Sequence, residues 1–451
     1  MYKYRLLLYC IASIVTFLNA PNLFDYNYCF GCAGLYLLIA IDSIFRERKK
    51  SGWLNFSIIF TVFLFITSFL IPLALFFDVT YIFYFPYICK ATALCPLALC
   101  FYYIGRSIAF SKATSLNFNF FVTKKMLIIC NLLTIIVMIT YLLNFQQFID
   151  TSDVSSNDIE DRYMVTFLYS IPPLALLLST FYYKGRIYGI KSFFICNKII
   201  LISMFIAILT SLYIGDRTIP LYLVLCIIFV YNKFVKPVKL TFVIILALCC
   251  GSLFYAIGQT RKGESAIREV GISGILNYNS FDRNIINYFS DFYPSSEANY
   301  LFVKWREDHG GDLYYPSKIF LYMVAPIPFV PSIFSNVFYG VPYTHLSSGY
   351  LSTNLYRQFV RNIYGGIGTH AVGDIYVSWG VVGIIILFLL LGYVAGKSYL
   401  NSQVNIYSAL IYMSLFADAI YMARASLFDC YRTIIFQIII YCLIKQFCVR
   451  R

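Results

Sequence analysis

Long apolar runs separated by short polar connections fill most of the chain. A helix needs about 20 apolar residues to cross the hydrocarbon core of a bilayer, and most of these runs come close to that length. The pattern therefore predicts an all-α, polytopic membrane protein with about 12 transmembrane helices. The runs are residues 6–20, 24–45, 54–77, 84–104, 126–145, 163–183, 193–214, 218–232, 240–257, 372–395, 404–423 and 433–447.

The same pattern divides the chain into three parts. Residues 1–257 hold the first nine predicted helices, residues 258–370 form one long loop, and residues 371–451 hold the last three helices. Within the loop, residues 313–339 are apolar but contain four prolines, which disrupt helical hydrogen bonds. We expect this segment to lie at the membrane interface or to re-enter the membrane, with a tight pair of short helices as the alternative.

Composition narrows the class of protein. Hydrophobic residues make up 60% of the chain, charged residues 12%, and the mean hydropathy is +0.74. These values exclude a soluble globular domain. The net charge of +14 is compatible with nucleic-acid binding, but the lysines and arginines gather in short clusters between the apolar runs. Such clusters are typical of topogenic signals, so we expect no nucleic-acid partner.

The basic clusters also predict the orientation. They occur at every second boundary between apolar runs, for example at residues 46–50, 124–125 and 233–239, and both termini lie on the basic side. The connection 146–161 instead carries five acidic residues. By the positive-inside rule, both termini are predicted to be cytoplasmic and the 258–370 loop to face outward. In a bacterium, such a protein belongs in the inner membrane.

Histidines are confined to the loop, where His309, His345 and His370 lie. His370 stands where the loop returns to the membrane, and Asp374 follows about one helical turn later on the same face. An imidazole there is suited to act as general base on an acceptor hydroxyl, with Asp374 orienting the ring or acting as the base itself. A satisfied structural histidine is the alternative. His345 is a weaker candidate, His309 resembles a solvated turn, and the spacing of the three fits no zinc site.

Arg217 is the most informative cation at the predicted outer face. It lies in the sequence Gly215-Asp216-Arg217 between two apolar runs, with almost no loop to carry it into water. It either pairs with Asp216, or extends to the interface, or receives a phosphate group in bidentate fashion.

Six further arginines lie in the predicted outer loop, and besides Arg283 and Arg306 they form two pairs. Arg261 and Arg268 are seven residues apart, or about two helical turns. Arg357 and Arg361 are four residues apart and would share a helix face, with either an anion between them or water around them. We expect the anion to be a pyrophosphate. The candidate pyrophosphate ligands are therefore Arg217, Arg261, Arg268, Arg357 and Arg361.

The outer face of a bacterial inner membrane offers such an anion, a saccharide carried on polyprenyl pyrophosphate. The chain has no Walker-type glycine loop and no DxD triplet for a metal-bound sugar nucleotide. Chemistry at this face would use an already activated substrate, and arginines would stabilise the pyrophosphate as it leaves. We therefore expect neither a cofactor nor a metal. The cysteines lie mostly inside apolar runs, and even the CxxC pair Cys29 and Cys32 is expected to be packing.

Three features of the chain resemble the O-antigen polymerase (Wzy) family of oligosaccharide repeat-unit polymerases. They are Gly215-Asp216-Arg217 at the outer end of a span, Arg261 at the start of a long outer loop, and the run GDIYVSWGVVG at 373–383. The topology covers the full length, whereas the motifs cover a small part. The resemblance implies transfer of a growing glycan from polyprenyl pyrophosphate onto a newly exported lipid-linked repeat unit. It also implies that Arg217 and Arg261 hold donor phosphates, and that a chain-length regulator is a partner.

Two alternatives stay open beside the polymerase. O-antigen ligases look similar and also carry a histidine near the last return from loop to helix, so His370 does not separate the two. A flippase for lipid-linked oligosaccharides would bind the same head group without breaking a bond. Transporters often have charges at mid-membrane depth and two related halves. Here the predicted helix centres are nearly charge-free and the outer loop is single, which favours the enzyme.

Overall fold

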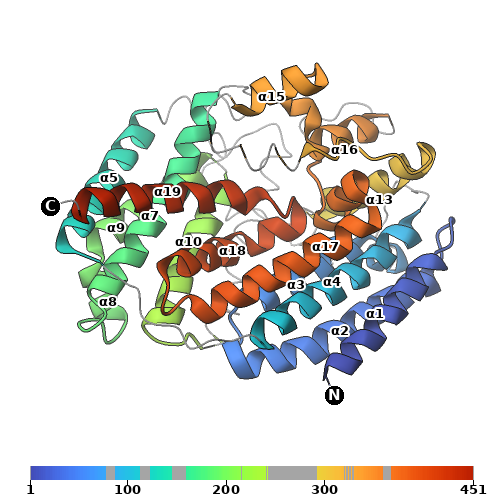
Figure 1. Ribbon diagram of the computed structural model, residues 1–451, viewed down its shortest axis with the longest axis horizontal. Coiled ribbons are helices and arrows are strands. Elements are labelled where there is room, and N and C mark those ends of the chain that lie inside the picture. Colours follow the sequence, from blue (N-terminus) through green and yellow to red (C-terminus); the bar gives the residue numbers. More distant parts are fainter. Residues whose placement is uncertain are drawn as a thin grey trace, which may run out of the picture. The chain divides into compact units, whose positions relative to one another are not determined.

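The computed structural model describes residues 2–77, 87–111, 122–144, 159–214, 216–239, 241, 292–318, 320, 324, 327, 330–358 and 367–449. Every regular element in these ranges is a helix (Figure 1), as the all-α prediction requires. The chain forms two compact units, each discontinuous in sequence. Unit 1 comprises Met1–Ser115, Ile285–Leu400 and Ala419–Tyr431, and unit 2 comprises Leu116–Asn284, Asn401–Asp418 and Arg432–Arg451.

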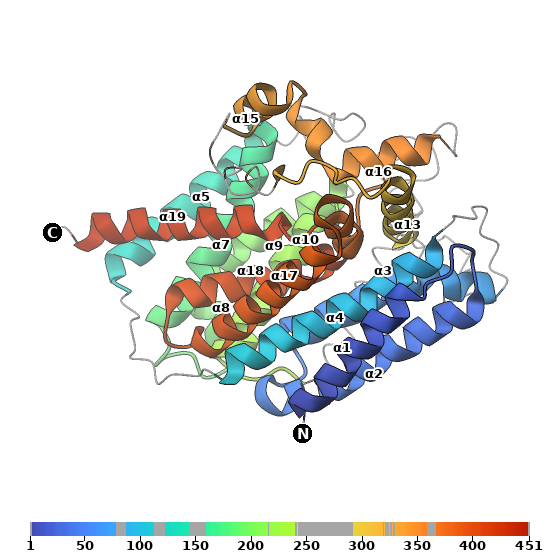
Figure 2. The ribbon, with the colours of Figure 1, turned by 45° about the vertical axis from the view of Figure 1, so that its right-hand side comes forward.

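Unit 1 is built on the N-terminal helices. α4 packs against α1, α2 and α3, while α13 packs against α3, α4 and α16. Figures 1 and 2 show α13 and α16 beside the first turns of α17. The helices of this unit are α1 (Tyr2–Leu18), α2 (Tyr26–Ser51), α3 (Phe56–Phe76), α4 (Ile88–Ser111), α13 (Tyr293–Asp308), α15 (Val330–Tyr339), α16 (Ser348–Arg357) and α17 (Ala371–Asn401), with a 3₁₀ turn η3 at Tyr343–Leu346.

Unit 2 is centred on α7, which packs against α5, α9 and α10. Two C-terminal helices, α18 and α19, contribute residues to both units. The helices are α5 (Lys124–Leu143), α7 (Ile159–Tyr182), α8 (Ile190–Cys196), α9 (Lys198–Ile214), α10 (Thr218–Phe234), α18 (Ile406–Arg424) and α19 (Asp429–Val449).

Two of the prolines inside the helices are matched by side chains that donate to the carbonyl left without a partner. Pro72 of α3 has no N–H for the carbonyl of Ser68 four residues earlier, and the hydroxyl of Tyr300 lies 3.4 Å from that oxygen. In α7, Pro173 leaves the carbonyl of Tyr169, which accepts from the Gln437 side chain at 3.5 Å. Apolar surroundings make such replacement donors necessary, because lipid supplies none.

Glycines let α4 and α17 approach backbone to backbone. A Cβ atom on Gly392 would lie 1.9 Å from the carbonyl oxygen of Tyr102, and one on Gly105 would lie 1.9 Å from that of Leu389. Small residues at a helix crossing are a recurrent solution in membranes, where close van der Waals packing holds helices together. The long α17 is thereby fixed against the N-terminal helices.

Eight helices in the described ranges are long and apolar enough to cross a membrane, or nine if one bent pair is a single span. The bent pair, Ile190–Cys196 and Lys198–Tyr213, turns by 92° where a straight span 193–214 was expected. Two shorter apolar helices, Tyr4–Leu18 and Thr218–Phe234, correspond to predicted spans, while residues 240–257 lie almost wholly outside the described residues. The helices thus identify a multi-pass membrane protein. They do not confirm the expected number of spans or the long outward loop.

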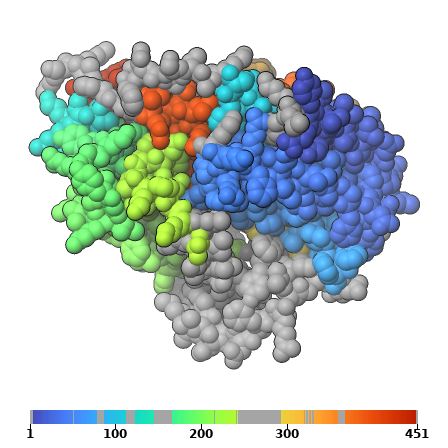
Figure 3. Space-filling view, turned by 90° about the horizontal axis from the view of Figure 1, so that it is seen from below, coloured from blue at the N-terminus to red at the C-terminus, as the bar shows by residue number. Residues whose placement is uncertain are grey.

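The surface of the N-terminal helices, blue in Figure 3, is suited to lipid. Five aliphatic side chains of α1 are more than half exposed: Leu7 at 57%, Leu8 at 64%, Ile11 at 52%, Val15 at 52% and Leu18 at 72%. Leu38 of α2 is 59% exposed. Monomeric soluble proteins rarely leave so many large apolar groups open to water, whereas acyl chains accept them.

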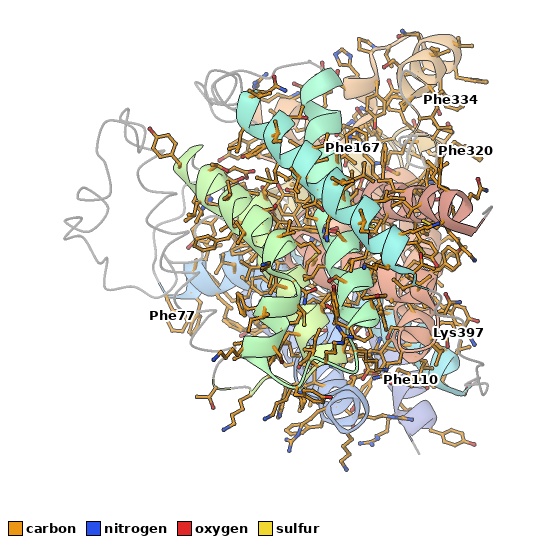
Figure 4. The ribbon with its side chains drawn as sticks, turned by 90° about the vertical axis from the view of Figure 1, so that its left-hand side faces the viewer. Phe77, Phe110, Phe167, Phe320, Phe334 and Lys397 are labelled. Carbon is orange, nitrogen blue, oxygen red and sulfur yellow. The ribbon has the colours of Figure 1, made fainter. Side chains whose placement is uncertain are left out.

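The two ends of unit 1 can be told apart by labelled side chains. Phe110 of α4 and Lys397 of α17 lie at one end, and Phe320 and Phe334 lie at the other (Figure 4). Since basic residues gather at the cytoplasmic ends of spans, the Lys397 end is the expected inner end. The segment between α13 and α17 then belongs to the expected outer end.

Candidate functional site

A group of buried polar side chains gathers where α3, α13, α16 and the start of α17 meet. None of its members is more than 3% exposed. Buried polar groups are stable only when their hydrogen bonds are satisfied, so their partners reveal what each side chain does. We call this group the polar cluster and define it as Ser68, Glu297, Lys318, His370, Asp374 and Ser426.

His370 caps the N-terminus of α17. Its Nδ1 atom accepts the backbone N–H groups of Val372 at 3.3 Å and Gly373 at 3.4 Å, the second and third residues of the helix. Nε2 therefore carries the proton and donates to Ser68 Oγ at 3.3 Å, while Ser68 donates onward to Leu64 O at 2.6 Å. Burial lowers the pKa of His370 to about 3. Such a ring is a weak base at neutral pH, which favours the structural alternative for His370 over general-base catalysis.

Asp374 forms a buried ion pair with Lys318. Its Oδ1 atom lies 2.6 Å from Lys318 Nζ, and its Oδ2 atom accepts from Ser426 Oγ at 2.7 Å. The lysine and aspartate side chains are 2% and 0% exposed. Both carboxylate oxygens are thus engaged. Asp374 joins the 313–339 segment to the turn that connects α18 and α19.

The run 373–383 breaks the helix at Gly380, whose φ of 66° and ψ of −160° are non-helical. Upstream of the break, two carbonyls accept hydrogen bonds from outside the helix. Arg306 Nη1 donates to Tyr376 O at 3.0 Å, and the backbone N–H of Tyr314 donates to Val377 O at 2.9 Å. The guanidinium also lies 4.6 Å from the Tyr376 ring. The break therefore docks the end of α13 and the segment after it onto α17.

Other positions of this run are equally constrained. A Cβ atom on Gly373 would lie 2.8 Å from both Asn299 Oδ1 and the Phe302 ring of α13. Trp379 donates its indole N–H to Pro316 O at 2.6 Å, and its ring lies 5.4 Å from Lys318 Nζ. The GDIYVSWGVVG run is thus a docking strip for α13 and for residues 314–318.

Glu297 is the buried carboxyl group of α13. It is 1% exposed and shares a hydrogen bond with Tyr356 of α16. Burial raises the pKa of Glu297 to about 8, so that this side chain is mostly protonated at neutral pH. Further along α13, Glu307 pairs with Lys90 of α4 at 2.5 Å and accepts from Tyr376 Oη at 3.3 Å.

Arg424 is the last residue of α18 and lies beside the start of α13. Its guanidinium lies 5.8 Å from the ring of Phe292, which is the N-cap residue of α13. Within the described part of the chain, no carboxylate lies within ion-pair distance of Arg424. Phe292 gives α13 no side-chain cap. A cation and the start of a helix are therefore neighbours.

The five arginines predicted to bind pyrophosphate lie in different parts of the chain. Arg357 is exposed at the C-terminal end of α16, in unit 1. Arg217 is the N-cap residue of α10, in unit 2, and neighbouring Asp216 accepts the Thr218 N–H at 2.8 Å instead of standing free. Arg261, Arg268 and Arg361 lie outside the described residues, so their role stays a prediction.

The remaining histidines have local partners. His309 forms the C-cap of α13 and stacks on Trp305 with ring centroids 4.3 Å apart, as a solvated turn would allow. His345 lies in η3 and stacks on Tyr350 at 4.1 Å. Across the ranges that the structure covers, no group of three or more metal-ligating side chains could hold a metal ion.

Sequence reasoning did not single out Glu297, Lys318, Arg306 or Arg424 as site residues. Lys318 offered a signal, since it is a lone cation inside the apolar 313–339 segment. Arg424 offered another, as an arginine at the predicted outer end of a span. Glu297 and Arg306 offered none, because the stretch that became α13 reads as a polar, aromatic loop.

Comparison with known proteins adds no assignment: no family model matches the chain, and neither curated proteins nor solved structures give a match. Function must therefore be argued from the residues themselves.

Proposed function

We propose that this protein is a membrane glycosyltransferase that polymerises polyprenyl-pyrophosphate-linked oligosaccharide repeat units at the outer face of the inner membrane. In this reaction an acceptor hydroxyl attacks the anomeric carbon of the growing glycan. The bond from that carbon to the pyrophosphate breaks, the pyrophosphate leaves with the lipid, and the hydroxyl proton passes to water at the outer face. The multi-pass helical fold supports the proposal, as does the resemblance of residues 215–217 and 373–383 to the polymerase family.

The observation that carries the proposal is the pairing of Arg424 with the start of α13. A guanidinium binds phosphate oxygens in bidentate fashion, and the positive end of a helix dipole also favours an anion. Arg424 lies beside the Phe292 ring at the head of that helix, at the end of unit 1 where the polar cluster lies. A pyrophosphate head group is the anion that a membrane-embedded site of this kind would take.

The polar cluster supplies a rigid frame around this position. The ion pair of Asp374 with Lys318, and the bond from Ser426 to Asp374, hold the turn after α18 against α17. Fixed geometry lowers the barrier by keeping reacting groups in place. In this scheme His370 and Asp374 maintain the frame, and the arginines stabilise charge on the departing pyrophosphate. The family resemblance separately implies phosphate ligands at Arg217 and Arg261, which belong to unit 2.

The direct test is reconstitution. Purified protein in liposomes is incubated with lipid-linked repeat units, without nucleotide, and both glycan length and released polyprenyl pyrophosphate are measured. We expect a ladder of products and one released carrier for each bond formed. Absence of elongation by the intact protein, with head-group binding retained, would instead indicate the flippase. Transfer to a lipid A acceptor without a ladder would indicate the ligase.

The site itself is tested with a matched pair of variants. Arg424→Ala should lower elongation by about tenfold to a hundredfold, the range for one charge-assisted hydrogen bond. Arg48→Ala is the control, because Arg48 is likewise an arginine over an aromatic ring, 4.5 Å from Trp53, but stands at the basic end of α2. We expect it to keep full activity. Equal activity of the two variants would remove Arg424 from the site.

A further inference from the structure

Two cysteines on different helices face each other at the expected outer end of unit 1. The Sγ atoms of Cys29 in α2 and Cys89 in α4 lie 3.7 Å apart, and the residues are 1% and 0% exposed. A disulfide bond needs sulfur atoms about 2.05 Å apart, so the two sulfur atoms must approach each other further for the bond to form. The sequence offered only the CxxC spacing of Cys29 and Cys32, which concerns a different pair.

The surroundings of Cys89 favour its reactive form. It lies in the first turn of α4, where the helix dipole stabilises negative charge. The backbone N–H of Asp25 donates to Cys89 Sγ at 3.3 Å. Both features stabilise a thiolate, which is the nucleophile of thiol–disulfide exchange.

The expected location of the pair is an oxidising one. α2 carries Arg46, Arg48 and Lys49 near its C-terminal end, and Cys29 stands in its first turn, at the opposite end. By the positive-inside rule the basic end is cytoplasmic, so Cys29 and Cys89 face the periplasmic side. Disulfides form and persist there, whereas the cytosol keeps thiols reduced.

We propose that Cys29 and Cys89 form a disulfide bond that ties α2 to α4. The Cys89 thiolate attacks the disulfide of an oxidised periplasmic thiol oxidoreductase, giving a mixed disulfide and one freed thiolate. Cys29 then attacks the Cys89 sulfur and expels the second thiolate. The two protons and two electrons of the cysteines pass to the oxidoreductase, which is reduced to the dithiol. Because both thiols are buried in the packed protein, the exchange occurs while the helices assemble.

The bond would fix the start of α4 beside the functional site. Cys89 precedes Lys90, whose ammonium group pairs with Glu307 of α13 at 2.5 Å. A tie at Cys89 therefore holds the helix that carries this ion pair. The inference depends on the expected orientation and not on glycosyl transfer, so it can fail while the proposed function stands.

The test is site-resolved differential alkylation of the full-length protein in cells. Acid-trapped membranes are denatured, free thiols are blocked with a light reagent, and the remaining thiols are reduced and labelled with a heavy one. We expect mostly heavy label at Cys29 and Cys89, and light label at Cys32 and at the buried control Cys130. In Cys29→Ser, Cys89 should become light, whereas Cys32→Ser should leave both labels heavy.

Each contrary result would overturn the inference. Light label at both Cys29 and Cys89 in the wild-type protein would mean that the thiols stay reduced. Heavy label at Cys29 and Cys32, lost in Cys32→Ser, would assign the bond to the CxxC pair. If Cys29→Ser does not insert, Cys29→Ala and Cys89→Ala provide the same comparison, because alanine is small and favours helix.

Discussion

Replacing His370 separates its two possible roles, because asparagine can cap a helix but cannot accept a proton as a base. In His370→Asn, the amide oxygen can accept the N–H groups of Val372 and Gly373 that the ring now holds at 3.3 and 3.4 Å. In His370→Ala, the cap is lost at about 1 kcal/mol, and the emptied buried volume adds about 2 kcal/mol more. Asparagine keeps the cap and fills part of the volume, so we expect His370→Ala to be less stable than His370→Asn by about 2 kcal/mol.

Thermal unfolding in detergent, followed by size-exclusion chromatography, measures the stability difference. Elongation per folded molecule then measures the chemistry. A structural histidine predicts that His370→Asn keeps activity within a few fold. Loss of a general base typically lowers the rate by a factor on the order of 10² to 10⁴. Wild-type stability combined with a loss of that size in His370→Asn would refute the structural role.

Acid provides a second readout for the same residue. The pKa of His370 falls from 6.5 to about 3 on burial, so the unfolded chain binds a proton in a range where the folded protein does not. The folded protein should therefore lose up to about 1.4 kcal/mol per pH unit from this group as the pH falls below 6.5. In His370→Asn this component should be absent, and an unchanged acid profile would show that the ring is not buried as described.

Three further perturbations test the frame around the site. Asp374→Asn should destabilise the fold by about 3 kcal/mol or more, because it leaves Lys318 buried without a counter-charge. The double variant Asp374→Leu, Lys318→Met should recover much of that loss. Normal stability of the single variant would contradict the buried pair. Gly380→Ala should destabilise the fold by about 2 kcal/mol, because φ is 66° at this position and an Arg306 atom lies 2.4 Å from the new Cβ. The control Gly34→Ala has open space around it and should be neutral or stabilising. Similar melting temperatures for the two variants would argue against the kink. Glu297→Gln should become more stable relative to wild type as the pH rises from about 5 to 8. The reason is that the pKa of Glu297 is raised from 4.5 to about 8, so the unfolded chain ionises in this range while the folded state resists ionisation. A pH-independent difference in stability between the two proteins would show that Glu297 titrates normally.

The apolar pattern of the sequence by itself determined the class of the protein. Most predicted spans have a matching helix, because the length and apolar composition of each segment by themselves determine whether it can cross the lipid. The sequence also located the break in residues 313–339 through its prolines, and the described part of that segment includes the short helix α15. The bend of 92° between α8 and α9 was not foreseen, since an apolar run has the same composition whether it is straight or bent.

Tertiary structure decided what the polar residues do. The contacts of His370 with Val372, Gly373 and Ser68 exist only in the folded chain. Asp374 and Lys318 are 56 residues apart in the chain, and Cys29 and Cys89 are 60 apart. No local pattern encodes such pairs. Hydropathy is a property of each segment, whereas charge pairing and capping arise only when distant segments fold against one another.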